Sequence, residues 1–147
     1  EMLQVHVHAH LSLFLKGEQI AIPYGIGIVQ PFQVKNGFVG VGRGIYWLHT
    51  HDATGIIHVE SPDSRTYTLG QFFDIWGQTL NAREVAGLEG AVRAYVDGKR
   101  HSGDPRDIVL SPGDSFVFDQ RGDALISALD DSRLLLLETC APAAAHD

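Results

Sequence analysis

Cysteine, basic charge and long apolar runs are all scarce in this chain of 147 residues. The single cysteine, Cys140, has no partner within the chain, so an internal disulfide framework is excluded. Lysine and arginine number 11 against 18 acidic residues, and they are scattered singly. We therefore expect no binding to nucleic acid, which usually requires a basic patch. No apolar run approaches the roughly 18 residues of a membrane-spanning helix, so we expect no span in this chain.

The rest of the composition is typical of a single globular domain. Hydrophobic residues make up 44% of the chain and charged residues 20%, which separates it from disordered sequences. A chain of this length can bury a core without disulfide support. We predict one β-rich domain over residues 1–140, followed by a disordered tail over residues 141–147. Because a strand pattern begins soon after Glu1, we also expect that a leader has been removed.

A strand is predicted at the start of the chain from its hydrophobic period. Apolar residues occupy alternate positions from 5 to 13, and histidines occupy positions 6, 8 and 10 between them. A period of two predicts one apolar face and one face that carries the histidines. Lys16-Gly17 supplies a turn, and residues 19–22 are the expected returning strand of a hairpin.

A second hairpin is predicted in the middle of the chain. Its first strand covers residues 46–51, its turn covers 52–55, and its second strand covers 56–60. Gly55 is suited to the positive φ that such a turn demands. Histidines at positions 49 and 51 share one face of the first strand, and the second strand places a histidine at position 58 beside Glu60.

One helix is predicted over residues 68–77. Thr68 and Gln71 have the spacing of a capping box, apolar residues follow at helical spacing, and Gly77 is suited to end the helix. A second short helical turn is expected over residues 82–87. The last third of the chain returns to strands, which we expect at residues 92–96, 99–101, 108–110, 115–118, 124–129 and 134–139.

Together these elements predict an α+β, β-rich fold. The preferred architecture is a β-grasp-like sheet with an added N-terminal hairpin, and with the helix over residues 68–77 covering one face. This arrangement would bring positions 8 and 10 toward positions 49 and 51. A β-sandwich or a cupin-like barrel is the alternative, because short strands with glycine-rich turns suit either.

The histidines point to metal chemistry. Five of the eight lie in two groups, at positions 6, 8 and 10 and at positions 49 and 51. Alternate residues of a strand share a face and lie roughly 6.5 to 7 Å apart, so two such rings can converge on one ion. Imidazole nitrogen suits copper and zinc. If the two strands are neighbours, His8, His10, His49 and His51 supply three or four ligands to a copper or zinc ion.

Four further residues could complete this site. We expect His6 and His58 as additional ligands, although a histidine on a strand face can also be exposed or bonded to a backbone carbonyl. Glu60 could be a partner of a ligand or a general base, and Asp52 could orient one of the ligand rings. If the site were catalytic, Glu60 or Asp52 would carry protons beside an open metal position.

Four strings in the chain resemble a family of uncharacterised bacterial proteins that often have an exported or membrane-anchored start. The resemblance runs from about residue 6 to 118 and rests on the strings HVHAHLSLFLKGEQIAIPYGIGI, YWLHTHDATGIIHVESP, RTYTLGQFFDIWGQ and YVDGKRHSGDPRDIVL. It implies an extracytoplasmic setting, periplasmic or secreted, in which copper or zinc handling would be useful. Many relatives carry a cysteine just before the YWLHTH string, where this chain has Gly44 and Ile45, so any role of that thiol is absent.

Three functions are compatible with these patterns. The first is binding of copper or zinc for storage, delivery or sensing. The second is a small metalloenzyme, in which three histidines and an open position activate water or oxygen. The third is an interaction domain without metal, whose histidines respond to pH. The native metal, the substrate and the formation of homo-oligomers stay open at this point.

Overall fold

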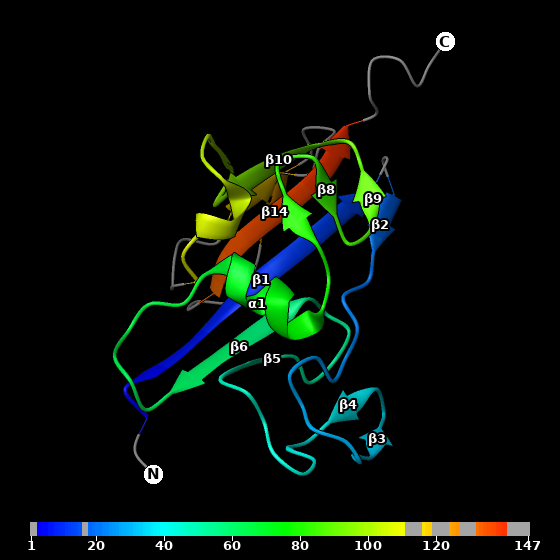
Figure 1. Ribbon diagram of the computed structural model, residues 1–147, viewed down its shortest axis with the longest axis vertical. Coiled ribbons are helices and arrows are strands. Elements are labelled where there is room, and N and C mark those ends of the chain that lie inside the picture. Colours follow the sequence, from blue (N-terminus) through cyan, green and yellow to red (C-terminus); the bar gives the residue numbers. More distant parts are fainter. Residues whose placement is uncertain (1–2, 16–17, 111–115, 119–123, 127–131, 141–147) are drawn as a thin grey trace.

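The computed structural model describes residues 3–15, 18–110, 116–118, 124–126 and 132–140 (Figure 1). Side chains are described for residues 3–14 and 18–110. The predicted turn at Lys16-Gly17 and the predicted tail over residues 141–147 lie outside these ranges.

A seven-stranded sheet forms the body of the protein, and with one helix it makes the β-rich α+β fold that the sequence predicts. Six strands follow the order β11-β10-β14-β1-β6-β5, and β2 also pairs with β1. The central strands β1 and β14 are parallel, and the other neighbours are antiparallel. The seven strands are β1 (Val5–Leu15), β2 (Glu18–Ile20), β5 (Leu48–His49), β6 (Ile56–Ser61), β10 (Ala91–Val96), β11 (Lys99–His101) and β14 (Ser132–Cys140).

The alternation in β1 produces the two faces that its period predicts. Ala9 and Leu13 are fully buried on one face, whereas the histidines at positions 6, 8 and 10 lie on the other. The register sets Ala9 opposite Ile57 and position 7 opposite Val59, so the apolar face continues from β1 onto β6. One face of the sheet is therefore core, and the opposite face carries polar groups.

The helix α1 (Leu69–Trp76) begins and ends where the sequence predicts. The hydroxyl of Thr68 accepts from the N–H of Gln71, and the side-chain oxygen of Gln71 accepts from the N–H of Thr68 at 2.9 Å. At the other end Gly77 has a φ of 82°, and its N–H donates to the carbonyl oxygens of the last turn. The predicted capping box and glycine stop are both confirmed.

The apolar side of α1 packs on the core face of the sheet (Figure 1). Phe72 and Phe73 are fully buried there, in one cluster with the apolar residues of β1 and β6. Burial of two aromatic side chains contributes several kcal/mol to folding, at roughly 25 cal/mol per Å² of apolar surface. The helix therefore covers the core face of the sheet and leaves the histidine-bearing face uncovered by α1.

Among the described residues, none forms a helix with the length and apolar character of a membrane span.

Residues 80–89 form a small three-stranded sheet, so the helical turn predicted over 82–87 is wrong. Ala86 and Gly87 have φ values of 50° and 84°. Two consecutive positive φ values are typical of a two-residue hairpin turn and incompatible with a helix. The strands of this sheet are β7 (Leu80–Asn81), β8 (Glu84–Val85) and β9 (Leu88–Glu89).

Two predicted strands are shorter in the structure. The first strand of the middle hairpin, predicted over 46–51, pairs only at β5, and Val109 makes a single bridge to Thr68 instead of a strand over 108–110. The strands predicted over 92–96 and near the C-terminus are present. The remaining short elements are β3 (Val34–Lys35), β4 (Phe38–Val39), η1 (Pro105–Asp107), β12 (Phe116–Phe118) and β13 (Ala124–Ile126).

Candidate metal centre

Three histidines form a row across neighbouring strands of the sheet. Strands β1, β6 and β5 lie side by side in this order (Figure 1). In the register of β1 with β6, His8 lies opposite His58, and in the register of β6 with β5, His58 lies opposite His49. Directly opposed residues on one face have their Cβ atoms about 4.5–5.5 Å apart, so their rings meet. The rings of His8 and His58 are edge-to-face with centroids 4.8 Å apart, and those of His58 and His49 are stacked at 5.4 Å.

His51 completes a cluster with two members of this row. It follows β5 by two residues, and its ring lies 4.8 Å from that of His49 and 4.7 Å from that of His58, edge-to-face in both cases. One nitrogen from each of His49, His51 and His58 can be chosen so that all three lie within 4.8 Å of one another. Among the described residues, this is the group that could hold a metal ion.

Backbone carbonyls fix the tautomers of two of these rings. Nδ1 of His49 lies 2.7 Å from the carbonyl oxygen of Tyr46, and Nδ1 of His51 is bonded to the carbonyl oxygen of Val39. A carbonyl oxygen only accepts, so each Nδ1 carries the proton and donates it. In a neutral ring Nε2 then has a free lone pair, and a metal ion binds to this nitrogen.

The hairpin of β3 and β4 holds His51 in place. Phe38 stacks on the His51 ring with centroids 4.9 Å apart and planes 11° from parallel. The N–H of Val39 donates to the carbonyl oxygen of His51 at 2.8 Å, and Nδ1 of His51 donates in return to the carbonyl oxygen of Val39. The connecting residues Asn36 and Gly37 both have positive φ, as a tight hairpin turn requires. The hairpin of β3 and β4 therefore restrains the position of the His51 ring within the cluster.

Burial favours the neutral form of two members of the cluster, His49 and His58. His49 is fully buried, and burial lowers its pKa, although the bond to the Tyr46 carbonyl opposes this shift. Burial lowers the pKa of His58 to about 4, assisted by repulsion from the neighbouring histidines, of which His51 contributes most. A charged ring loses solvation in such a place, so the uncharged form is favoured. Neutral imidazole is also the form that a metal ion requires.

One nitrogen of the cluster has an unmet bonding capacity. Nε2 of His49 is buried and has no hydrogen-bond partner. The nearest carboxylate oxygen, Oε1 of Glu60, is 3.8 Å away, which is too long for a hydrogen bond. A buried polar atom left in this state costs about 1–3 kcal/mol. A metal ion bound at this nitrogen would remove that cost.

The other residues predicted for the site lie around the cluster. His8 touches His58 but is outside the group of converging nitrogens. His10 points away, because its Nε2–H donates to the carbonyl oxygen of Thr54 at 2.9 Å. His6 pairs with Glu60 at 3.2 Å.

Asp52 holds the turn between the two strands. Its Oδ1 accepts from both the N–H and the hydroxyl of Thr54, an arrangement typical of a side chain that replaces a backbone turn bond. The bonds that orient His49 and His51 come from carbonyl oxygens instead. Asp52 acts on the cluster by its charge, which raises the pKa of His58 against the larger effect of burial.

The sequence placed His58 among the secondary ligands, whereas the structure puts it at the centre of the row. The turn predicted over 52–55 contains the signal that could have found it. An antiparallel hairpin centred between residues 53 and 54 sets position 49 opposite position 58, as observed. A site made of His8, His10, His49 and His51 required the strand of His8 and His10 to lie beside the strand of His49. In the structure β6 lies between β1 and β5, so His58 is the residue next to His49.

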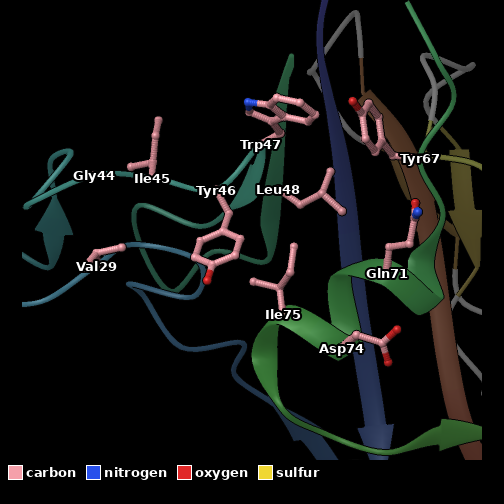
Figure 2. A pocket seen from close by; sticks show the side chains of 10 residues that line it. All are labelled: Val29, Gly44, Ile45, Tyr46, Trp47, Leu48, Tyr67, Gln71, Asp74 and Ile75. Atoms are coloured by element: carbon pink, nitrogen blue, oxygen red, sulfur yellow. The ribbon is translucent and has the colours of Figure 1, made fainter. Parts of the chain in front are cut away.

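A pocket of about 590 Å³ lies between α1 and the segment that leads into β5 (Figure 2). Its described lining is mostly apolar and aromatic and includes no histidine. Two of its polar groups have partners: the Tyr67 hydroxyl bonds to that of Ser61 at 2.6 Å, and Asp74 pairs with Arg106 at 2.7 Å. None of the described residues of the lining belongs to the cluster.

In comparisons with known proteins, no family model, no curated protein and no solved structure matches this chain. Function is therefore inferred from the geometry of the cluster.

Proposed function

We propose that this protein binds a transition-metal ion, copper or zinc, with His49, His51 and His58 as ligands. The observation that carries the proposal is the convergence of three ring nitrogens within 4.8 Å, two of them with the tautomer already set by backbone carbonyls. Imidazole nitrogen is a preferred ligand of both metals. The resemblance of this chain to exported bacterial proteins supports a role in metal storage or delivery outside the cytoplasm.

The geometry needs only a small adjustment to hold an ion. Tetrahedral zinc with Zn–N bonds of about 2.0–2.1 Å places its nitrogens about 3.4 Å apart. From a largest separation of 4.8 Å, the rings must close by at most about 1.4 Å. His49 is fixed by burial and its carbonyl bond, and His51 is held by the Val39 carbonyl and by Phe38, so the partly buried His58 would make most of this movement.

Three protein ligands leave one position of a tetrahedral ion for a further donor. Glu60 and His8 are the neighbours of the cluster, and either could approach, as could water. The described lining of the pocket in Figure 2 contains no member of the cluster, so this pocket does not place a substrate at the ion. Binding is for this reason favoured over the metalloenzyme hypothesis, while an interaction domain without metal predicts no ion at all.

Metal content tests the proposal. The untagged protein is stripped with a chelator, dialysed against zinc or copper(II), and measured by inductively coupled plasma mass spectrometry. We expect about one ion per chain for the native sequence, and a large loss in His51→Ala and in His58→Ala. His101→Ala is the matched control, because that histidine lies on β11 at the opposite edge of the sheet.

Circular dichroism of each variant separates lost ligands from lost fold. His51 and His58 are chosen over His49 because they are less buried, so their replacement disturbs the core less. A native protein without tight metal binding would overturn the proposal. Folded His51→Ala and His58→Ala variants with native metal content would overturn the ligand assignment.

A further inference from the structure

A second pair of potential ligands lies on the same face of the sheet, one row from the cluster. His6 on β1 is directly opposite Glu60 on β6, and Nε2 of His6 is 3.2 Å from Oε2 of Glu60. The backbone N–H of Glu60 donates to the carbonyl oxygen of Trp47 at 2.8 Å, which fixes the strand at this point. The imidazole and the carboxylate thus face one another on a rigid part of the sheet.

Glu60 lies between this outer pair and the cluster. Its Oε2 faces Nε2 of His6 at 3.2 Å, and its Oε1 is 3.8 Å from Nε2 of His49. Each carboxylate oxygen is therefore directed to a different imidazole. The inner of these two nitrogens is the buried one that has no hydrogen-bond partner.

Exposure falls steadily along this line of groups. The side chain of His6 is 54% exposed, that of Glu60 is 24% exposed, and that of His49 is fully buried. An ion in solvent can reach His6 directly, but it cannot reach Nε2 of His49 without passing other groups. The ring of His8 flanks the same line, 5.5 Å from the ring of His6 and 4.8 Å from that of His58. Potential donors thus continue from the surface to the cluster.

We propose that His6 and Glu60 form a transfer site through which a divalent zinc or copper ion enters and leaves the buried centre. This inference rests on the proposed function and adds how the same centre exchanges its ion. An imidazole together with a carboxylate binds such ions more weakly than three imidazoles, so the ion is held briefly at the surface and tightly inside. Such a site suits a protein that delivers its metal, because a closed structural site has no need for an exposed entry.

The transfer is an exchange of coordination bonds with no change in oxidation state. The ion first binds Nε2 of His6 and a carboxylate oxygen of Glu60, the proton that Nε2 directs at the carboxylate passes to solvent, and the ion loses water molecules. The bond to His6 then breaks as a bond to Nε2 of His49 forms, while Glu60 stays bound through the step. Bonds to His51 and His58 replace the bond to Glu60 last. Release follows the same steps in reverse.

Zinc exchange kinetics test this route. Loading is followed by stopped-flow mixing of the metal-free protein with a zinc-loaded fluorescent indicator of weak affinity, and release by mixing the zinc-bound protein with excess EDTA. The variants are His6→Gln and Glu60→Gln, which keep the size of a polar side chain and remove a ligand. His101→Gln, on the far edge of the sheet, is the control for loss of a histidine elsewhere.

We expect loading and release to slow by the same factor in both variants, about tenfold for the loss of one transient contact in the exchange step. The control should exchange zinc as the native protein does. Native exchange rates in His6→Gln and Glu60→Gln would overturn the transfer site and leave the centre intact. Faster release with unchanged loading would also overturn it, because these residues would then be ordinary ligands. If the native protein binds neither zinc nor copper at equilibrium, the proposed function fails together with this inference.

Discussion

Replacement of His58 by glutamine should make the stability of the metal-free protein less sensitive to acid. The folded protein holds the pKa of His58 at about 4, whereas the unfolded chain has the ordinary value of 6.5. Between these values the unfolded chain binds the proton and the folded protein does not, so the free energy of unfolding falls as the pH falls through 6.5 toward 4. The full difference corresponds to about 3 kcal/mol at 1.36 kcal/mol per pKa unit.

The ring of His58 is partly exposed, so solvent screening reduces this figure to about 1–2 kcal/mol. Urea unfolding of the metal-free protein at about pH 7.5 and about pH 4.5 measures it as the difference between native and His58→Gln. The other ionisable side chains are the same in both proteins, so the comparison isolates the effect of replacing His58. If the free energy of unfolding falls equally with pH in the native protein and in His58→Gln, the conclusion that His58 is held neutral by burial is wrong.

Other perturbations test the supports of the site and the fold. Gly27→Ala should cost about 2–4 kcal/mol in urea unfolding, because a Cβ at its φ of 74° would collide with the Leu48 carbonyl oxygen beside His49. Gly37→Ala is its control, with a similar φ of 75° in open space, and a cost equal to that of Gly27→Ala would contradict the close approach. Thr68→Ala should cost about 1 kcal/mol by loss of the capping box, and an unchanged unfolding midpoint would count against that cap.

Local patterns were enough to predict much of the fold. The capping residues Thr68 and Gln71 and the stop at Gly77 define α1, because caps and helical spacing act within a few residues. The alternation in β1 likewise predicts the burial of Ala9, Leu11 and Leu13, although Ser12 and Phe14 on the opposite face are also buried. The wrong prediction of a helical turn over residues 82–87 also has a local cause. The positive φ of Ala86 is unusual for alanine, so the residue type does not indicate a turn there.

The place of His8 and His10 relative to the cluster depended on strand order, which local patterns do not contain. Histidines were expected from both groups, but the pairing of β1 with β6 puts His58 between His8 and His49. The carbonyl partner of His51 was also not predictable, because Val39 lies in a separate hairpin for which the sequence analysis predicts no element. This bond depends on packing between distant residues, and it decides which nitrogen of His51 can bind a metal.

The most direct test of the metal centre is long-range ¹H–¹⁵N NMR of the histidine rings, recorded before and after addition of zinc. In the metal-free protein, His49 and His51 should carry their proton on Nδ1. With about one equivalent of zinc, Nε2 of both rings and one nitrogen of His58 should shift to values of metal-bound nitrogen, while His10 keeps its spectrum. Zinc-dependent shifts confined to other histidines, or no shifts at all, would contradict the assignment of this cluster as a metal centre.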